Sequence, residues 1–444
     1  MRASIPTDLP YAHCAPVSPA RSGEKWRTIA AIAALAFLSI AVTQGANAGA
    51  PGPDEHDAIE ADDGNPPREK ESVPASIQSP EDETRSTRFR SPVSAAPLDP
   101  SARMLEGSDA SEAWTLYVEL DSGHRIAQRF LISNAGPGDH NAVAVGHLIE
   151  PGRPPYRYQN GRRRARWKLS DDHLFLDIAA SHLDLHRPTG ELRITKKEIE
   201  IRLFFEFPKS ALASRVPNER LPKDYHVDVL AVAAKTHGTI HAPWMTEPLE
   251  TNGRTWLAHT WTQKDEARLL DRRIEIYGYE DGTSFYGLEI RRGKDFDRAW
   301  TLAESDSAGM IESLINIPAR WTEIARTGKN DSTSAYPVPS RFEFSGGSNL
   351  GQITLGREWL RFDPLAVIPQ PFRWFIRRIT QPQEVWADAR IGVTLSTALE
   401  TPSLPIASET ESDSNSKRET EEETAERSVT GVASITFLNP AKGR

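Results

Sequence analysis

Apolar and polar side chains alternate along most of the chain from Trp114 onward, as they do on strands that bury one face. In WTLYVEL (114–120) every second residue is large and apolar, and the stretch 124–133 continues the pattern after a short Asp-Ser-Gly turn. The two stretches predict a β-hairpin. A second hairpin with the same layout is predicted around Asp281-Gly282.

More strands are predicted between and after these hairpins. The dipeptide Asn160-Gly161 predicts a tight turn between two strands within 156–169. The stretch 226–244 predicts a strand, then a glycine turn and a loop. Further alternating stretches lie at 141–150, 173–186, 191–207, 339–346, 351–356, 358–365, 385–396 and 428–439.

Helical periodicity is weak throughout the chain. The best candidate for a helix, 305–325, contains Pro318, and 369–382 predicts one short helix between prolines. Many short strands with closely spaced turns are typical of barrels and sandwiches. The sequence therefore predicts an all-β fold of two consecutive antiparallel β-barrels that pack together, over 109–247 and 248–444.

Two segments have a composition that cannot form a packed core. Residues 49–108 and 405–428 are rich in proline, serine and charged residues, and they carry part of the net charge of −9. Because burial cannot offset the entropy of ordering them, we predict a disordered linker and a disordered acidic loop. The stretch 428–439 has the pattern of a last strand, so the acidic loop is predicted to connect two paired strands.

The first 48 residues have the layout of a secretory signal peptide. Basic residues precede the apolar run 28–42, and Ala46-Asn47-Ala48 is a small-residue cleavage site. The apolar run is shorter than the about 20 residues of a membrane-spanning helix. We therefore expect a periplasmic or secreted protein, with an uncleaved membrane anchor as the alternative.

Several kinds of site are excluded or disfavoured. Cys14 is the only cysteine and precedes the apolar run, so the mature chain has no disulfide, thiol nucleophile or cysteine ligand. His237 and His241 have the i, i+4 spacing of a helical zinc site, but they lie in a predicted strand and loop. The glycines of 133–141 precede a strand rather than a helix, unlike a Rossmann loop. We expect no metal and no cofactor.

A run of arginines in RRRAR (162–166) is the strongest basic signal. Nucleic-acid binding usually needs a broad basic face, which the sequence does not show elsewhere. We interpret the run as a solvated hairpin end or sheet edge and expect no nucleic-acid partner.

The densest chemical stretch is GRTWLAHTW, from Gly253 to Trp261. On a strand, Leu257, His259 and Trp261 share one face, while Arg254, Trp256 and Ala258 share the other. His259 in an apolar lumen is a candidate catalytic acid or base. A hydrogen-bonded core histidine is the structural alternative. The candidate ligand-binding residues are Trp256, Trp261, Arg254, Tyr277, Tyr286 and Trp114.

The stretches 112–139, 253–261 and 274–287 resemble the tandem lipocalin-like superfamily. This group includes carotenoid 1,2-hydratases (hydroxyneurosporene synthases) and AttH-like secreted proteins. The resemblance implies two lipocalin-like barrels over about 108–440, each able to enclose an apolar ligand. It also implies an acidic residue before the histidine, where this chain has Ala258. Because that carboxylate is missing, hydratase chemistry would need another acid, and Asp177, Glu275 and Glu289 are the candidates.

Three functions remain open. The first is an exported lipocalin-like protein that binds a hydrophobic small molecule (a lipid, isoprenoid or carotenoid) in a barrel lumen. The second is a hydratase, isomerase or cyclase that acts on such a ligand without a cofactor. The third is an envelope protein whose linker and acidic loop contact partners. The first two are compatible with transient membrane contact, and the sequence does not decide whether the protein is an enzyme.

Overall fold

In the computed structural model, the described residues are 98–134, 139–207, 214–292, 296–307, 310–325, 336, 338–346, 349–367, 374, 377, 381–397 and 423–438. The predicted signal peptide, the linker up to residue 97 and most of the predicted acidic loop lie outside them. None of the helices in these ranges is long and apolar enough to cross a membrane.

The first sheet is antiparallel and has the order β4-β3-β2-β1-β12-β11-β9-β8-β7-β6-β5, with β10 paired to β11. Its edge strand β4 contacts β7 through side chains, because Asn160 Nδ2 donates to Ser181 Oγ at 2.8 Å. The strands are β1 (Ser111–Leu120), β2 (Arg125–Ser133), β3 (Asn141–Ile149), β4 (Tyr156–Arg162), β5 (Lys168–Leu169), β6 (Phe175–Ile178), β7 (Ser181–Asp184), β8 (Thr189–Lys196), β9 (Ile199–Glu206), β10 (Ser214–Arg215), β11 (Tyr225–His241) and β12 (Leu249–Thr262).

The second sheet is a closed antiparallel barrel in chain order. The short helix α2 (Glu266–Leu269) joins it to the first sheet, and Asp265 caps this helix by accepting from Ala267 N. The strands are β13 (Arg272–Glu280), β14 (Thr283–Arg292), β15 (Phe296–Ser307), β16 (Met310–Ala325), β17 (Pro339–Gly346), β18 (Asn349–Phe362), β19 (Gln383–Thr397) and β20 (Glu423–Phe437). Short 3-10 turns are η3 (Arg164–Arg166), η4 (Asn218–Arg220) and η5 (Pro364–Val367).

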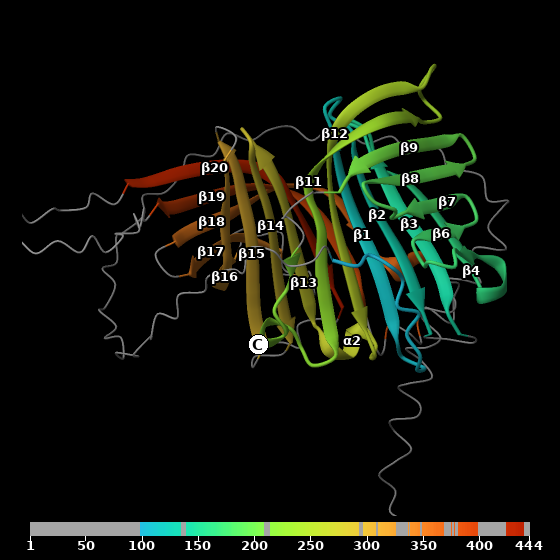
Figure 1. Ribbon diagram of the computed structural model, residues 1–444, viewed down its shortest axis with the longest axis horizontal. Helices are drawn as coiled ribbons and strands as arrows, with labels where there is room; N and C mark the ends of the chain where they lie inside the picture. Colours follow the sequence, from blue (N-terminus) through green and yellow to red (C-terminus); the bar gives the residue numbers. More distant parts are fainter. Residues whose placement is uncertain are drawn as a thin grey trace, which may run out of the picture.

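The two sheets lie side by side, with α2 at one end between them (Figure 1). The all-β prediction is confirmed, as are the hairpins at Asp121–Gly123 and Asp281-Gly282. Each sheet has its own apolar interior, and a third buried cluster lies between the sheets. The concave side of the first sheet is filled by buried side chains that include Trp114, Phe130 and Leu257.

The division between the sheets comes later than predicted. Strand β12 pairs with both β1 and β11, so it belongs to the first sheet, and the division lies within 263–271 rather than at 247/248. Local alternation does not reveal which strand is the partner, because either sheet would bury one face of β12. The stretch GRTWLAHTW therefore lies at the centre of the first sheet and does not begin the second.

Part of the predicted disordered linker is ordered. Residues 98–107 cross the first sheet, and we call this segment the strap. Its carbonyl at Pro100 accepts from Trp114 Nε1 at 3.1 Å, and the N–H of Ala102 donates to the carbonyl of His173 at 2.9 Å. Arg187 NH2 donates to the carbonyl of Leu98 at 3.2 Å. These contacts give hydrogen-bond partners to backbone groups of the strap. Composition alone does not reveal such partners.

Four other predictions are corrected by the strand pairing. Asn160-Gly161 is no turn, because β4 continues through it and pairs with β3. The best helix candidate, 305–325, is mostly strand β16, and the glycine turn at Gly238 is part of β11. Strand β20 begins at Glu423, inside the predicted acidic loop, and it pairs with β19 as predicted. In each case a long-range partner strand outweighs the local signal.

Gly253 lets β12 approach β1 closely. A Cβ atom at this position would lie 2.2 Å from the carbonyl oxygen of Glu119 and 2.8 Å from Leu120 Cα. Gly253→Ala is therefore expected to lower the free energy of unfolding by about 1–3 kcal/mol, because backbone has to shift. Urea unfolding measures the change. The neighbouring exposed Asn252→Ala is the control, and an equally small effect of both would contradict the close approach.

Candidate functional site

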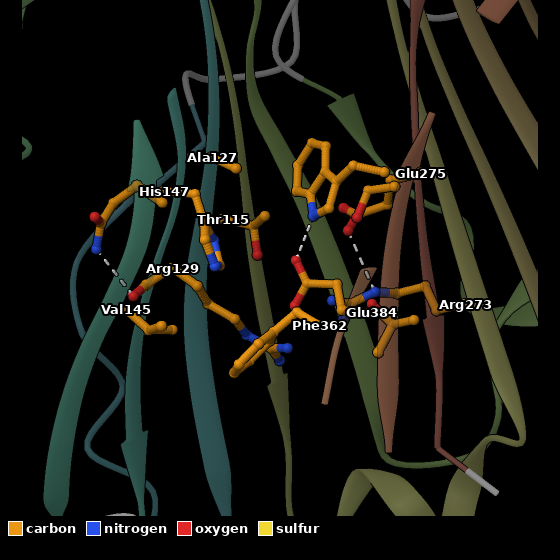
Figure 2. Close-up of a pocket in the computed structure, with 13 residues that line it drawn as sticks. Thr115, Ala127, Arg129, Val145, His147, Arg273, Glu275, Phe362 and Glu384 are labelled. Carbon is orange, nitrogen blue, oxygen red and sulfur yellow. Dashed lines mark hydrogen bonds and ion pairs between the residues drawn. The ribbon is translucent and has the colours of Figure 1, made fainter. Parts of the chain in front are cut away.

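A cleft opens between the two sheets, away from the interior of either one (Figure 2). Its cavity volume is about 30 Å³, and the space reaches about 400 Å³ only when the part open to solvent is counted. Strands β1, β2 and β3 form one wall, and the outer face of the barrel forms the other. The lining residues are Thr115, Ala127, Gln128, Arg129, Val145, His147, Arg273, Glu275, Phe362, Glu384, Trp386, Ser434 and Thr436.

Strand alternation places polar side chains on both walls. The apolar residues of β13, such as Ile274 and Ile276, fill the barrel, so Arg273, Glu275 and Tyr277 project outward. Residues that pair across an antiparallel ladder share a face, and Ser434 of β20 is opposite Glu275. The outer face of the barrel would be solvated in an isolated barrel. Here it presents a strip of polar side chains to the first sheet.

Buried aromatic rings form the floor beside the cleft. Tyr117 of the first sheet stacks on Tyr277 of the barrel with centroids 5.1 Å apart, and Tyr277 stacks on Trp386 at 6.1 Å. Trp256 packs against Tyr117 at 5.4 Å and donates from Nε1 to the carbonyl of Phe285 at 3.1 Å. These contacts join the two sheets through apolar burial and one cross-sheet hydrogen bond.

Glu266, at the start of α2, accepts hydrogen bonds from side chains of both sheets. It accepts from Arg273 NH1 at 2.7 Å, from Arg129 NH2 at 3.1 Å and from Tyr225 OH at 2.9 Å. Burial alone would raise the pKa of Glu266, but the charges of Arg273 and Arg129 lower it to about 2. One carboxylate thereby holds an arginine from each sheet.

Two further carboxylates face the cleft. Glu275 is 2 % exposed, accepts from Tyr286 OH at 3.0 Å and lies 3.3 Å from Arg273 Nε. Glu384 accepts from Trp386 Nε1 at 2.5 Å (Figure 2). Of the three acids considered from the sequence, Glu275 alone lines the cleft. Glu289 forms a buried pair with Arg272 at 2.6 Å, and Asp177 lies near His182 at 3.4 Å.

His147 stands on the opposite wall as an uncharged imidazole. Burial, together with the nearby charge of Arg157, lowers the pKa of His147 to about 4. Its ring meets Phe362 edge-on at 5.5 Å, and Arg157 lies 3.9 Å above the same phenyl ring. At neutral pH this imidazole can accept a proton or a hydrogen bond.

Four polar atoms in residues that line the cleft are buried without a hydrogen-bond partner among the described residues. They are Thr115 Oγ1, Gln128 Oε1 and the Nε atoms of Arg129 and Arg273. Most buried polar groups in proteins have a partner, and leaving one without a partner costs about 1–3 kcal/mol.

His259 lies on the other face of the first sheet, inside the core. Its Nε2 is 2.7 Å from Glu112 Oε1, and both side chains are buried. Its ring stacks on Trp114 with centroids 4.5 Å apart and an interplanar angle of 9°. Glu112 also accepts from the backbone N–H groups of Arg103 (2.7 Å) and Met104 (3.2 Å) in the strap.

The contacts of His259 favour one tautomer. Its Nδ1 is buried without a hydrogen-bond partner in the described part of the chain, whereas Nε2 faces a carboxylate. The proton therefore belongs on Nε2, because a buried N–H without an acceptor is the costlier arrangement. The geometry is that of a hydrogen-bonded core histidine, and a catalytic role for His259 stays a prediction.

The residues proposed from the sequence fall into two groups on opposite faces of the first sheet. Trp114 is fully buried beside His259, and Trp261 lies next to them under Arg103 and Arg215. The other group borders the inter-sheet cluster: Trp256, Tyr277, Tyr286 and Arg254, whose NH2 donates to Tyr279 OH at 3.0 Å. The predicted division of β12 into two faces agrees with these contacts.

Sequence reasoning missed Glu112, His147, Glu266 and Glu384. The carboxylate that lies beside His259 belongs to Glu112 of β1, the strand that pairs with β12. One signal was present, because Glu112 shares a face with Trp114 on the strand predicted to bury that face. In the described residues, no three His, Cys, Asp or Glu side chains are grouped to hold a metal ion.

Comparisons with known proteins reach the fold only. No family model matches the chain, and no curated protein matches it. Solved structures that match include an AttH-type protein (NE1406) from Nitrosomonas europaea (14 % identity, TM-score 0.48, 77 % of this chain and 99 % of that chain). CghA with Sch210972 matches at 9 % identity and TM-score 0.49, over 76 % of this chain and 90 % of that one. Kievitone hydratase from Nectria haematococca matches at 9 % and 0.44, over 77 % and 93 %.

The predicted resemblance to AttH-like and hydratase-like proteins is thus found among solved structures, at the level of fold. Identities this low do not assign an activity to this chain.

Proposed function

We propose that this protein binds an uncharged amphipathic small molecule, such as a lipid or isoprenoid with a hydroxyl or carbonyl group, in the inter-sheet cleft. The proposal rests on the buried polar atoms of the cleft lining that have no hydrogen-bond partner among the described residues, above all those of Thr115 and Arg129. These two can donate to a ligand oxygen. Phe362 and Trp386 on the opposite wall offer apolar contact.

The charges around the cleft favour a neutral ligand. Because Arg129 and Arg273 are each paired with a carboxylate, a charged ligand group beside them would leave one charge uncompensated. The ligand's polar end is therefore a hydrogen-bonding group without charge. The paired groups are Arg129, Arg273, Glu266 and Glu275.

The inter-sheet cleft accommodates the ligand better than a barrel lumen does. The concave side of the first sheet is packed with buried apolar side chains, and His259 is enclosed there. With the predicted export signal, the proposed role is that of a periplasmic or secreted carrier.

Thr115→Val is expected to weaken binding of an uncharged naphthalene ketone dye (6-propionyl-2-dimethylaminonaphthalene) about fivefold. The change removes one hydrogen bond, worth about 1 kcal/mol, and keeps the shape of the side chain. Dye emission during titration measures the dissociation constant. The matched control is Thr195→Val, because Thr195 is an exposed residue of β8.

Equal dye affinity in the two variants would remove the cleft as the binding place. A naphthalene dye with a sulfonate in place of the ketone is expected to bind more weakly to the wild type. Native mass spectrometry of the protein purified from its host should then show a co-purified neutral lipid.

A second candidate function is a cofactor-independent hydratase or isomerase. It is favoured by Glu275 and the uncharged His147 at one cleft, which supply a carboxyl group and a base to a bound apolar substrate. Incubation of the co-purified ligand with the protein in ¹⁸O-labelled water distinguishes the two functions. Protein-dependent gain of ¹⁸O as a hydroxyl indicates hydration, and an unchanged mass with a changed chromatographic retention indicates isomerisation. Unchanged mass and unchanged retention leave binding alone.

A further inference from the structure

A cluster of basic side chains lies at the free edge of the first sheet, where β4 ends. Strand β4 is the last strand of the sheet order, and η3 and β5 follow it directly in the chain. The turn between β8 and β9 reaches the same edge, because Lys196 Nζ donates to the carbonyl of Gln159 in β4. We call the cluster the basic edge; its members are Arg162, Arg163, Arg164, Arg166, Lys168, Lys196 and Lys197.

The charges of the basic edge are not neutralised within the described protein. None of the seven side chains forms an ion pair with a carboxylate of the described residues, although ion pairs are frequent elsewhere on the surface. Arg162 and Arg164 donate to backbone carbonyls instead, and Arg164 lies over the ring of Trp167 at 4.5 Å. Glu198 is the adjacent acid in the β8–β9 turn.

Burial and the neighbouring charges all lower the pKa of Lys196. Partial burial has the largest effect, followed by the positive charges of Lys197, Arg162 and Arg157. Arg163, Arg164, Arg166, Lys168 and Lys197 are exposed to solvent. A chain with a net charge of −9 therefore concentrates positive charge at one edge, where self-repulsion is unfavourable unless an anionic partner binds.

We propose that the basic edge docks the protein on an anionic membrane surface by binding lipid phosphate groups. Arginine forks match phosphate oxygens, and clustered basic side chains are attracted to anionic lipid headgroups. The position of the basic edge is also suited to uptake of a lipid ligand from the membrane. Arg157 on the same strand lies over Phe362 of the cleft, so docking brings the cleft next to the lipid.

This inference concerns a different surface from the cleft and does not require the proposed ligand. Binding to vesicles tests the basic edge, while dye binding tests the cleft. Failure of either proposal is therefore distinguishable from failure of the other.

Flotation of the full chain with phosphatidylcholine vesicles that contain 30 % phosphatidylglycerol is the test. The wild type is expected to bind these vesicles at low salt, to bind neutral phosphatidylcholine vesicles far more weakly and to be released at 0.5 M NaCl. Screening over about 4–5 Å at that ionic strength weakens headgroup contacts. The apolar run 28–42 and the basic residues before it contribute equally in every variant, so the comparison of the variants below isolates the basic edge.

The triple variant Arg163→Gln, Arg166→Gln, Lys197→Gln is expected to lose about 100-fold in vesicle affinity, since each basic group contributes about fivefold. The matched control neutralises three exposed basic residues elsewhere, Lys223, Lys235 and Arg357, with the same change in net charge. Equal losses in the two variants, or equal wild-type binding to neutral vesicles, would overturn the proposal. Tighter binding to a DNA duplex than to the anionic vesicles would overturn the assignment to a membrane.

Discussion

Glu266→Gln is expected to lower the free energy of unfolding by about 3–5 kcal/mol at pH 7. The carboxylate accepts from Arg129 of the first sheet and Arg273 of the barrel, and its loss leaves Arg129, which is 23 % exposed, without its ion-pair partner. Arg273 keeps its contact with Glu275 at 3.3 Å, which limits the loss on that side. Urea unfolding followed by circular dichroism measures the difference between the proteins.

The effect of this variant should depend on pH in a defined direction. The pKa of Glu266 is about 2 in the folded protein and 4.5 in a free glutamate, so folding binds fewer protons at this group. Its contribution to stability is complete above about pH 4.5 and is lost as the pH falls toward 2. The difference of about 2.5 pKa units corresponds to about 3 kcal/mol.

The difference between wild type and Glu266→Gln should therefore shrink from pH 6 to pH 3. Glu250→Gln is the matched control, because Glu250 is exposed on β12. A constant difference across this range would mean that the arginine contacts, rather than the charge of Glu266, set the stability of the interface. Weakened dye binding in Glu266→Gln would further connect this carboxylate with the cleft.

The sequence predicts the strands and their faces well, because both depend on local alternation. The turns at Asp121–Gly123 and Asp281-Gly282 form hairpins. Strand β12 directs His259 and Trp256 to opposite faces of the sheet, as their spacing requires. Local signals fail where a distant strand decides. Asn160-Gly161 has the sequence of a tight turn, yet it stays extended because β3 pairs with both residues.

The site is less accessible to sequence reasoning for the same reason. Glu112 and His259 are 147 residues apart, and Arg129 and Glu266 are 137 apart. No spacing rule connects such pairs, because each depends on which strands become neighbours. The cleft also lies between the outer face of the barrel and the first sheet, where alternation alone predicts a solvated polar face. From sequence, the lumen of a barrel is therefore the predicted place for a ligand.

Glu112→Ala is expected to lower the free energy of unfolding by about 3–5 kcal/mol and to release the strap. The variant removes the acceptor of His259 Nε2 and of two backbone N–H groups, those of Arg103 and Met104. All three donors lose their carboxylate, and water reaches the core side of the sheet with difficulty. Thermal unfolding measures the stability loss, and the remaining strap contacts at Pro100 and Ala102 are expected to hold less firmly.

Limited trypsin digestion separates release of the strap from a general loss of stability. Cleavage after Arg103 should become at least tenfold faster in Glu112→Ala under conditions where the sheets stay folded, because the backbone N–H groups at this point lose their anchor. Glu112→Gln keeps one acceptor oxygen and is expected to give an intermediate rate. His259→Ala removes the imidazole but leaves Glu112 bonded to the strap, so it should lower the melting temperature with little change at Arg103. Equal cleavage after Arg103 in Glu112→Ala and His259→Ala would contradict this role of Glu112, since the two side chains would then hold the strap only through the packing that they share with Trp114.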